Sequence, residues 1–355
     1  MPKTRFGIIG CGSAAVPVCE AIAALPLAEL AHVHDTDLNL ARDMGERYRV
    51  PYTERLADLL GDPHVDVVYI AVPHDLLYRL TRQALEAGKH ALVEKPMALT
   101  LAQADGLIAL AEERQLALGV FYELRHSTAY QQARELIQAG AIGEVIGVRI
   151  QTVIDKPPHY WQAGYGGRSA NPWRGQKTRA GGGVVLMNTS HQLDAIHYLT
   201  GLEVVSVSAE VGTLTAPVEV EDIAAATLRF SNGAVGSLFA GAHLAGASAG
   251  SEHFDLFGRQ GQLRVPDAHG DGWLQVYLRR AWGDIPANLW HTVPGAKAQV
   301  YAEAVEAFAR AVQQGEPAPT NGHDARRVLA TVLALYQAAA EKRTLSIPVR
   351  EVNYA

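Results

Sequence analysis

A glycine-rich turn near the amino terminus constrains the fold of this chain more than any other feature. The apolar run Phe6 to Ile9 leads into Gly10-Cys11-Gly12-Ser13-Ala14-Ala15, and a helical pattern continues through Ala24. A strand, a Gly-x-Gly-x-x-Ala turn and a helix in this order are typical of a dinucleotide-binding sheet. Gly10 permits the tight turn, Gly12 lets the backbone approach a pyrophosphate, and Ala15 allows close helix packing. An ordinary glycine turn is the alternative.

The first third of the chain alternates strand-like and helix-like segments. Expected strands lie at 6–9, 29–34, 65–72, 91–93 and 117–121, and expected helices include 76–87 and 101–114. Strands that alternate with helices indicate right-handed βαβ units. We therefore predict a Rossmann domain, with a doubly wound parallel sheet, over residues 1–122.

Beyond this region strand signals dominate. Expected strands lie at 145–154, 204–212, 224–230, 234–240 and 254–257, and helices are expected at 129–139, 298–313 and 324–342. Asn232-Gly233 separates two of these strands and predicts a hairpin turn. We predict that residues 123–355 form an α+β domain with an open, largely antiparallel sheet. Two domains also suit a length of 355 residues, because single cores stop growing near ~250–300 residues.

Charge and composition exclude several functional classes. The net charge is −6 and the basic residues are scattered, which argues against nucleic-acid and membrane-surface partners. No apolar segment reaches the ~18–20 residues of a membrane span, and no signal peptide precedes the first strand. The two cysteines, Cys11 and Cys19, resemble packing residues, and no metal site is expected. A cytoplasmic protein is the expectation.

Asp35 ends the second expected strand, 23 residues after Gly12. This spacing fits a carboxylate that binds the ribose 2′-hydroxyl of a dinucleotide. Thr36 and Asp37 follow, with no arginine to receive a 2′-phosphate, so NAD is favoured over NADP. A solvated aspartate at the end of a strand is the alternative.

The next strand ends also carry polar residues. Val72-Pro73-His74 closes the third long strand, at the rim where doubly wound sheets bind ligands. We include these residues and Leu77 among the cofactor contacts, although His74 fits a surface loop nearly as well. Lys95 lies just past the strand 91–93, between Glu94 and Pro96, and the proline restrains its backbone. A lysine that is partly desolvated there can exchange a proton with a hydroxyl or carbonyl. A plain surface lysine is the alternative.

A second polar group follows three glycines at 181–183. Asn188, His191 and Asp194 are spaced by three residues and share one face of an expected helix. Such a face presents an imidazole to a substrate, with Asp194 placed to orient its far nitrogen. His197 lies six residues from His191, which is a poor spacing for metal ligands. A buried packing histidine is the alternative.

Residues 160–179 show no clear periodicity and are rich in glycine, arginine and aromatic residues. Long irregular loops in compact domains are commonly functional, and contact between subunits is the alternative. Arg168, Arg174 and Lys177 suit a phosphate or carboxylate on a substrate.

Taken in order along the chain, these motifs resemble the glucose–fructose oxidoreductase/inositol dehydrogenase/rhizopine-catabolism (Gfo/Idh/MocA) family. The resemblance runs nearly end to end and also rests on 86–90, 140–147, Trp173-Arg174 and 230–233. It implies a Rossmann domain, a second domain whose open sheet forms homodimers or homotetramers, and NAD(P)-dependent oxidation of a secondary alcohol. The implied substrate is a sugar, a sugar derivative or a cyclitol.

The resemblance also assigns roles to residues. Lys95 takes the position of the catalytic lysine and His191 that of the substrate histidine. Trp173, Arg174 and Arg125 match residues near the cofactor, and Tyr301 matches a residue of the substrate pocket. The complete predicted cofactor set is Gly10, Gly12, Ser13, Ala14, Ala15, Asp35, Val72, Pro73, His74, Leu77, Glu94, Lys95, Arg125, Trp173 and Arg174. The predicted substrate set is Lys95, Asn188, His191, Tyr301 and Arg168.

One position departs from the family pattern. Members similar to inositol dehydrogenase usually carry Asp four residues before the histidine, where this chain has Met187. Asn188 is then the polar residue left to contact the substrate, and Lys95 carries more of the acid–base work. Two other functions stay open: a non-catalytic sensor that binds NAD, and an enzyme that retains NAD while it cleaves a glycoside.

Overall fold

The computed structural model describes residues 2–168, 171–248, 251–266, 273–295 and 299–348. These form two compact units, each discontinuous in sequence. The first unit contains residues 1–123, 159–181 and 301–326, and the second contains 124–158, 182–300 and 327–355. The predicted boundary at 122/123 lies beside the first change of unit. However, 159–181 and 301–326 lie in the first unit, although the sequence places them in the second domain. The division into folding domains 1–122 and 123–355 stays a prediction.

The first unit is built on a six-stranded sheet with the order β3-β2-β1-β4-β5-β6. Its strands are β1 (Thr4–Ile9), β2 (Ala28–His34), β3 (Tyr52–Thr53), β4 (Val67–Ile70), β5 (His90–Val93) and β6 (Leu118–Val120). All described pairs in this sheet are parallel. The order reverses between β1 and β4, which is where a doubly wound sheet opens a crevice at its carboxyl edge. The predicted fold class is confirmed for this unit.

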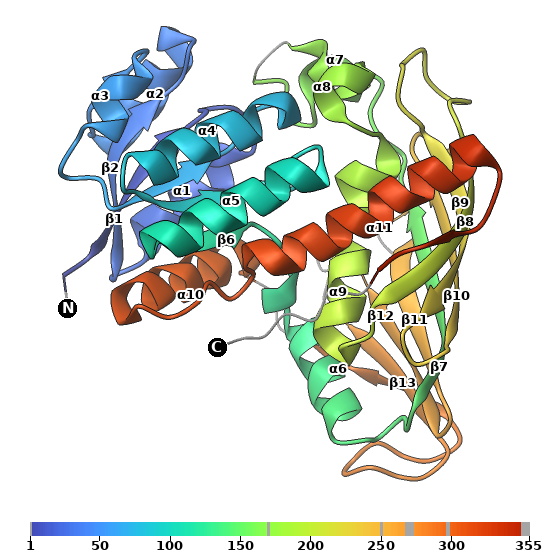
Figure 1. The fold of residues 1–355 in the computed structure, drawn as a ribbon. Coiled ribbons are helices and arrows are strands. Elements are labelled where there is room, and N and C mark those ends of the chain that lie inside the picture. The colour runs from blue at the N-terminus through green and yellow to red at the C-terminus, as the bar shows by residue number, and fades with distance from the viewer. Residues whose placement is uncertain (1, 169–170, 249–250, 267–272, 296–298, 349–355) are drawn as a thin grey trace. The chain divides into compact units, whose positions relative to one another are not determined.

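Helices cover both faces of this sheet (Figure 1). They are α1 (Ala15–Ala24), α2 (Leu38–Tyr48), α3 (Leu56–Leu60), α4 (His74–Glu86) and α5 (Leu101–Arg114). Helix α10 (Val300–Gln314) comes from late in the chain, and its Val305 and Phe308 are buried in one core cluster with Phe6 and Val18. Because β1 and α1 meet α10 in that core, the amino-terminal fold depends on a segment some 300 residues away in sequence.

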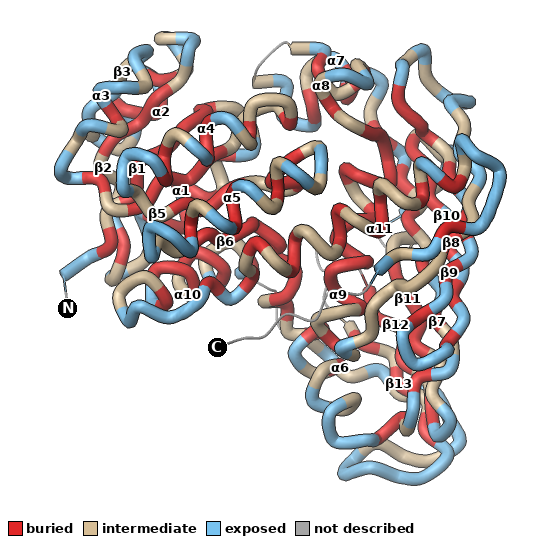
Figure 2. The backbone as a smooth tube through the Cα atoms, in the orientation of Figure 1, coloured by how far each residue is buried: buried red, intermediate tan, exposed pale blue. Residues whose placement is uncertain are grey.

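The second unit contains a nine-stranded sheet with the order β14-β13-β12-β11-β7-β10-β9-β8-β15. Its strands are β7 (Val145–Val153), β8 (Val204–Gly212), β9 (Ile223–Phe230), β10 (Val235–Gly241), β11 (Glu252–Gly258), β12 (Gly261–Pro266), β13 (Leu274–Leu278), β14 (Trp290–Val293) and β15 (Leu345–Ser346). The pairs are antiparallel except for β7 with β10, so the prediction of a largely antiparallel sheet is confirmed. Burial alternates along β9 and β10, which shows that one face of the sheet is covered and the other open (Figure 2).

The remaining helical segments complete the two units. They are η1 (Glu123–His126), α6 (Thr128–Gln138), α7 (Tyr160–Ala163), η2 (Pro172–Gly175), α8 (Lys177–Ala180), η3 (Val185–Thr189), α9 (Ser190–Thr200) and α11 (Gly322–Glu341). In its described residues, the expected irregular loop 160–179 contains short helical segments of four residues each, with non-helical residues between them. Segments of this length leave no period to detect. Strands β12, β13 and β14 have no counterpart among the expected strands, because segments of six, five and four residues give only a weak periodic signal.

Candidate functional site

The glycine-rich turn of the first unit contains two glycines with different structural roles. Gly10 has a φ of +92°, and a Cβ added there would lie 2.3 Å from the carbonyl oxygen of Ala71. A side chain is therefore excluded by the fold itself. A Cβ added at Gly12 meets nothing within 4 Å. Gly12 is thus not required by packing, and its open side leaves room for a ligand to approach the backbone.

Helix α1 begins directly after this turn, where Ala15 donates its N–H to the oxygen of Gly12 at 3.2 Å and Pro17 has no N–H. Its cap residue, Ala14, provides no side-chain hydrogen bond, and the first turn holds no acidic residue. Uncapped N–H groups and the helix dipole favour an anion at this end. Together with the open side of Gly12, this end of α1 fits the pyrophosphate of a dinucleotide.

Asp35 lies at the end of β2 and is held against the same turn. Its Oδ2 accepts a hydrogen bond from the backbone N–H of Cys11 at 2.8 Å, and its Oδ1 accepts one from Asp37 at 2.9 Å. Each carboxylate oxygen keeps a further lone pair for a hydroxyl donor. The arrangement suits recognition of a ribose diol, as predicted for this residue.

His74 begins α4 at the carboxyl edge of the sheet and is buried. Its Nδ1 lies 2.8 Å from the carbonyl oxygen of Ala180, so Nδ1 carries the proton and Nε2 is an acceptor. Its ring lies 4.5 Å from that of Trp173. Burial is the main cause that lowers the pKa of His74 to about 3; the cations of Lys95 and Arg174 act in the same direction, and the hydrogen bond to Ala180 acts in the opposite one. His74 is therefore a neutral hydrogen-bonding group and not a surface loop histidine.

Residues 159–181 fold onto the first unit through arginine contacts. The guanidinium of Arg174 lies over the rings of Trp173 and Tyr160, at 4.6 and 5.5 Å from their centroids. Arg179 binds Asp75 of α4 through its Nε at 3.1 Å. These contacts place Trp173 and Arg174, two predicted cofactor residues, beside His74.

Arg168 lies at the cofactor turn, although the sequence predicts it as a substrate contact. Its Nε donates to the carbonyl oxygen of Cys11 at 2.8 Å, and its Nη2 lies 2.5 Å from Oδ2 of Asp43. Nearby, a Cβ added at Gly166 would lie 2.6 Å from Oγ of Ser13. In this structure Arg168 contacts the turn and α2, and a role in substrate binding stays a prediction.

Lys95 follows β5 at the carboxyl edge of the same sheet, and the Lys95-Pro96 peptide is cis. The preceding Glu94 accepts a hydrogen bond from the hydroxyl of Tyr69 at 2.6 Å and one from the backbone N–H of Lys95 at 3.2 Å. Burial raises the pKa of Glu94 and, more strongly, that of Tyr69. The backbone of Lys95 is thus tied to a rigid core strand, β4, through one carboxylate.

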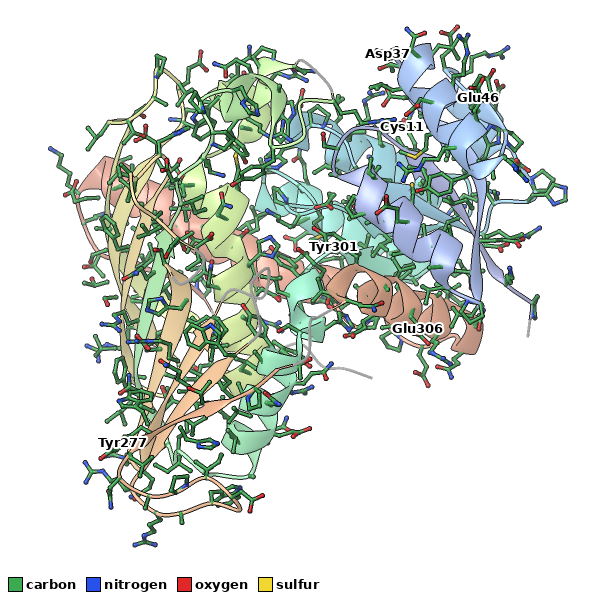
Figure 3. The ribbon with its side chains drawn as sticks, turned by 180° about the vertical axis from the view of Figure 1, so that it is seen from behind. Cys11, Asp37, Glu46, Tyr277, Tyr301 and Glu306 are labelled. Atoms are coloured by element: carbon green, nitrogen blue, oxygen red, sulfur yellow. The ribbon has the colours of Figure 1, made fainter. Side chains whose placement is uncertain are left out.

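Tyr301, predicted for the substrate pocket, also belongs to the first unit. It lies in the first turn of α10 (Figure 3). Its ring centroid is 5.9 Å from that of Phe121. Phe121 directly follows β6, so the phenol is near the carboxyl end of that strand. Contact with a substrate stays a prediction.

The second unit carries the other predicted substrate residues on one continuous helix. A π-helical stretch, η3, leads directly into α9, and it contains Asn188 while α9 contains His191. The Oδ1 atom of Asn188 is buried and has no hydrogen-bond partner among the described residues. A buried acceptor without a partner is costly unless a donor is supplied, and π-helical insertions are frequent at functional sites. Met187, at the position of the usual Asp, is buried.

Asp194, three residues after His191, binds Arg125. The Nε and Nη2 atoms of Arg125 lie 2.7 and 2.6 Å from the two carboxylate oxygens, and both residues are buried. The guanidinium also lies 5.0 Å from the ring centroid of Tyr198. Arg125 thus belongs to the second unit, and its predicted contact with nicotinamide, like the orientation of His191 by Asp194, stays a prediction.

The predicted residues are therefore divided between the two units. The first holds the glycine-rich turn, Asp35, His74, Lys95, Trp173, Arg174 and Arg168, and the second holds Arg125, Asn188 and His191. Three further residues support these groups: Tyr69 binds Glu94 beside Lys95, and Glu221 and Tyr336 bind backbone N–H groups at the start of the helix that carries His191. None lies in a recognisable motif, and each acts through a contact distant in sequence. Among the described residues, no group of three or more His, Cys, Asp or Glu is placed to hold a metal.

The fold and these side chains define a class of protein. A parallel sheet with an open dinucleotide turn, an aspartate at the end of β2 and a lysine after β5 is the construction of an NAD-dependent oxidoreductase. Residues 4–122 match the family described as "Oxidoreductase family, NAD-binding Rossmann fold", and residues 130–264 match "GFO/IDH/MocA C-terminal domain". The chain belongs to the Gfo/Idh/MocA oxidoreductase family, which confirms the predicted resemblance and the NAD cofactor.

Individual relatives agree with this assignment. The 1,5-anhydro-D-fructose reductase of Ensifer adhaerens is 32% identical over 297 residues, which cover 82% of this chain and 82% of that protein. The myo-inositol 2-dehydrogenase of Thermotoga maritima is 24% identical over 354 residues, covering 97% and 98%. A levoglucosan dehydrogenase, solved with NADH and levoglucosan, has the same fold with a TM-score of 0.87 at 24% identity, covering 98% and 100%. Among the described residues, no helix has both the length and the apolar character needed to cross a membrane.

Proposed function

We propose that this protein is an NAD-dependent dehydrogenase that acts on a secondary alcohol, or the corresponding ketone, of a sugar, sugar derivative or cyclitol. The relatives named for anhydrofructose and inositol support this substrate class. The aspartate after β2, with no arginine at positions 36 and 37, supports NAD over NADP.

The observation that carries the proposal is the position of Lys95. It follows β5, at the same carboxyl edge of the same sheet as the open glycine-rich turn. Bound NAD supplies the acceptor for the hydride that leaves the substrate carbon. Lys95 accepts the hydroxyl proton in oxidation and returns it in reduction, while Glu94 holds its backbone in place.

The second unit carries two further polar residues that the family resemblance assigns to the substrate. We propose His191 as a second acid–base group of the reaction, and the unsatisfied Oδ1 of Asn188 as the acceptor of a hydrogen bond from a substrate hydroxyl. A hydroxyl-rich substrate suits such an acceptor, because a buried oxygen without a hydrogen-bond donor destabilises the protein and a substrate hydroxyl would supply the donor. Met187 offers neither a proton nor a hydrogen bond at the position of the usual Asp.

Assembly and location are part of the same proposal. The uncovered face of the second sheet exposes Val235 and Phe239 on β10, and we propose that it joins copies of the chain into a homodimer or homotetramer. The protein would work in the cytoplasm, with no nucleic-acid or membrane partner. Light scattering of Phe239→Asp against the wild type tests the interface, and an unchanged mass in this variant would contradict it.

The function is tested by absorbance at the reduced-nicotinamide wavelength, with NAD and with NADP. The panel contains inositols, anhydrosugars, aldoses, uronates and nucleotide sugars. NADH formation that disappears in Lys95→Ala supports the dehydrogenase. NAD binding in calorimetry with no turnover across the panel favours the sensor, as Met187 does. Repeated cleavage of a glycoside without net NADH favours the NAD-retaining enzyme.

A further inference from the structure

The helix that carries Asn188 and His191 begins in an unusual way. The first N–H groups of a helix have no partner within it, and Ser, Thr, Asp or Asn at the cap usually supplies one. Here the residues before the helix are the glycines 181–183, which have no side chain to cap it. The first bond within the helix runs from the N–H of Met187 to the oxygen of Gly183. Four N–H groups before Met187 therefore need acceptors from elsewhere.

Glu221, in the segment just before β9, supplies three of these acceptors. Its Oε2 accepts from the N–H of Gly183 at 2.7 Å, and its Oε1 accepts from that of Val185 at 3.0 Å. Its main-chain oxygen accepts from the N–H of Val184 at 3.1 Å. A negative side chain at the positive end of the helix dipole also adds a favourable electrostatic interaction. One residue, 38 positions from Gly183, thus caps most of the first turn.

Tyr336 of α11 supplies the fourth acceptor. Its hydroxyl oxygen accepts from the N–H of Leu186 at 3.2 Å, and its O–H donates to Oε1 of Glu221 at 2.8 Å. The glycines are needed for this approach. A Cβ added at Gly182 would lie 2.1 Å from the Tyr336 hydroxyl, and one added at Gly183 would lie 1.8 Å from the main-chain oxygen of Glu221. The triple glycine therefore lets two distant residues reach the start of the helix.

The neighbouring Asp222 fixes Glu221 in turn. Its carboxylate accepts from the backbone N–H groups of Leu214, Thr215 and Ala216 at 2.7 to 2.8 Å, and it is fully buried. Burial raises the pKa of the Glu221 carboxyl, while its hydrogen bonds to the helix and to Tyr336 act in the opposite direction. Burial of a carboxyl costs free energy, and its hydrogen bonds offset part of that cost. We take this as a sign that the orientation of the helix must be fixed, which apolar packing alone would not do.

We propose that Glu221 and Tyr336 are positioning residues for the reaction, because together they set the direction of the helix that presents Asn188 and His191. The inference rests on the proposed function. Asn188 lies five residues beyond Gly183 and His191 eight, so a small rotation at the capped end displaces both side chains. Misplacement of a reacting group by about 1 Å can cost roughly a hundredfold in rate.

The test uses the full-length variants Glu221→Gln and Tyr336→Phe. A glutamine has one acceptor oxygen, so its amide group faces either the N–H of Gly183 or that of Val185. We expect kcat to fall roughly tenfold or more in each variant, because a hydrogen bond to a charged group is lost. The Kd for NAD, measured by calorimetry, should stay within about twofold of the wild-type value. The binding stoichiometry from the same titration gives the fraction of folded protein, by which kcat is corrected. Thr331→Val is the matched control: it removes the bond from the Thr331 hydroxyl to the oxygen of Arg327 on the same helix, α11.

Two further readouts separate positioning from general damage. If both residues hold one structure, the double variant should lose less activity than the product of the two single losses. Amide exchange of a peptide that covers 183–191 should rise roughly tenfold in Glu221→Gln, with no change in peptides of the first sheet. Unchanged kcat with faster exchange would overturn the positioning role, and unchanged exchange would overturn the capping itself. If the wild type turns over no compound of the panel while exchange responds as expected, the proposed function fails and the cap on the helix stands.

Discussion

Two carboxylates, the half-buried Glu94 in the first unit and the buried Glu221 in the second, have the same kinds of partner. Glu94 accepts from the hydroxyl of Tyr69 and from the backbone N–H of Lys95, and Glu221 accepts from Tyr336 and from two backbone N–H groups of the His191 helix. Burial raises the pKa of both carboxyls. In each unit a carboxylate–tyrosine pair therefore fixes the main chain of a segment that bears a predicted catalytic side chain.

The two pairs differ in how far they act along the chain. Glu94 is adjacent to Lys95, so a short motif contains both the support and the group it supports. Glu221 is 30 residues from His191, and Tyr336 is 145. At the end of a parallel strand, a neighbour in the sequence can hold a residue in place. A helix that starts without a capping side chain of its own depends on residues that only the fold brings near.

The largest expected effect is on the chemical step. Lys95→Met should lower kcat roughly a thousandfold, and His191→Asn roughly a hundredfold, because general acid–base groups contribute about 10²–10⁴. Steady-state rates with saturating NAD measure both. Lys89→Met is the control, since its ammonium binds the oxygens of Asp62 and Val65 at the opposite end of β5. Equal losses in Lys95→Met and Lys89→Met would contradict the role of Lys95.

Glycine replacement should separate folding from ligand binding. Gly10→Ala and Gly183→Ala should each destabilise the protein by about 3 kcal/mol or more, because the new Cβ meets a carbonyl oxygen at 2.3 or 1.8 Å. Gly12→Ala should change the free energy of unfolding by less than about 1 kcal/mol, since its Cβ enters open space. Its affinity for NAD should nevertheless fall at least roughly tenfold. Urea unfolding measures the change in stability, and calorimetry measures the affinity for NAD. If Gly12→Ala bound NAD as tightly as the wild type, the pyrophosphate would not lie on the open side of Gly12.

Low pH should destabilise the protein through one buried histidine in each unit. Burial lowers the pKa of His74 to about 3 and that of His126 to about 4, from an ordinary value of 6.5. Because the folded pKa is depressed, the stability is present above pH 6.5 and is lost as the pH falls toward these values. At pH 5 the loss should reach about 2 kcal/mol for His74.

Urea midpoints at pH 7 and pH 5 test this expectation. His74→Gln should show a smaller difference between the two pH values than the wild type, and His126→Gln should behave in the same way. If neither variant reduces the difference, these histidines are protonated in the folded protein.

The smallest effect concerns the carboxylates of Glu94 and Glu221. Their folded pKa is raised above the ordinary 4.5, so their contribution to stability is greatest at low pH and declines as the pH rises through the raised value. Glu94→Gln and Glu221→Gln should therefore flatten the fall in stability above pH 4.5. Thermal unfolding at pH 5 and pH 8 measures this, with Gln138→Ala, at an exposed position of α6, as control. If stability fell more steeply with pH in either variant than in the wild type, the pKa of the replaced carboxyl would not be raised in the folded protein.

Much of the architecture could be predicted because it depends on local patterns. The strands β1, β2, β7 and β8 and the helix α5 appear at or within two residues of the expected bounds, since apolar period and bounding glycines act over a few residues. The order of the motifs was sufficient to identify the family. Local patterns could not predict that α10 packs in the core of the first unit. They show that the helix has an apolar face, but not which core that face will join.

By itself, the sequence determined the order of strands and helices in the Rossmann domain, the two glycines at positions 10 and 12, and the presence of Lys95 and His191, whose side chains can move a proton. These depend on residue type and on neighbours close in the chain. Only the tertiary structure decided that Arg168 contacts the cofactor turn, that Arg125 pairs with Asp194, and that Glu221 and Tyr336 cap the His191 helix. The physical reason is that a helix start leaves N–H groups that must find acceptors, and no local rule states which distant residue will provide them.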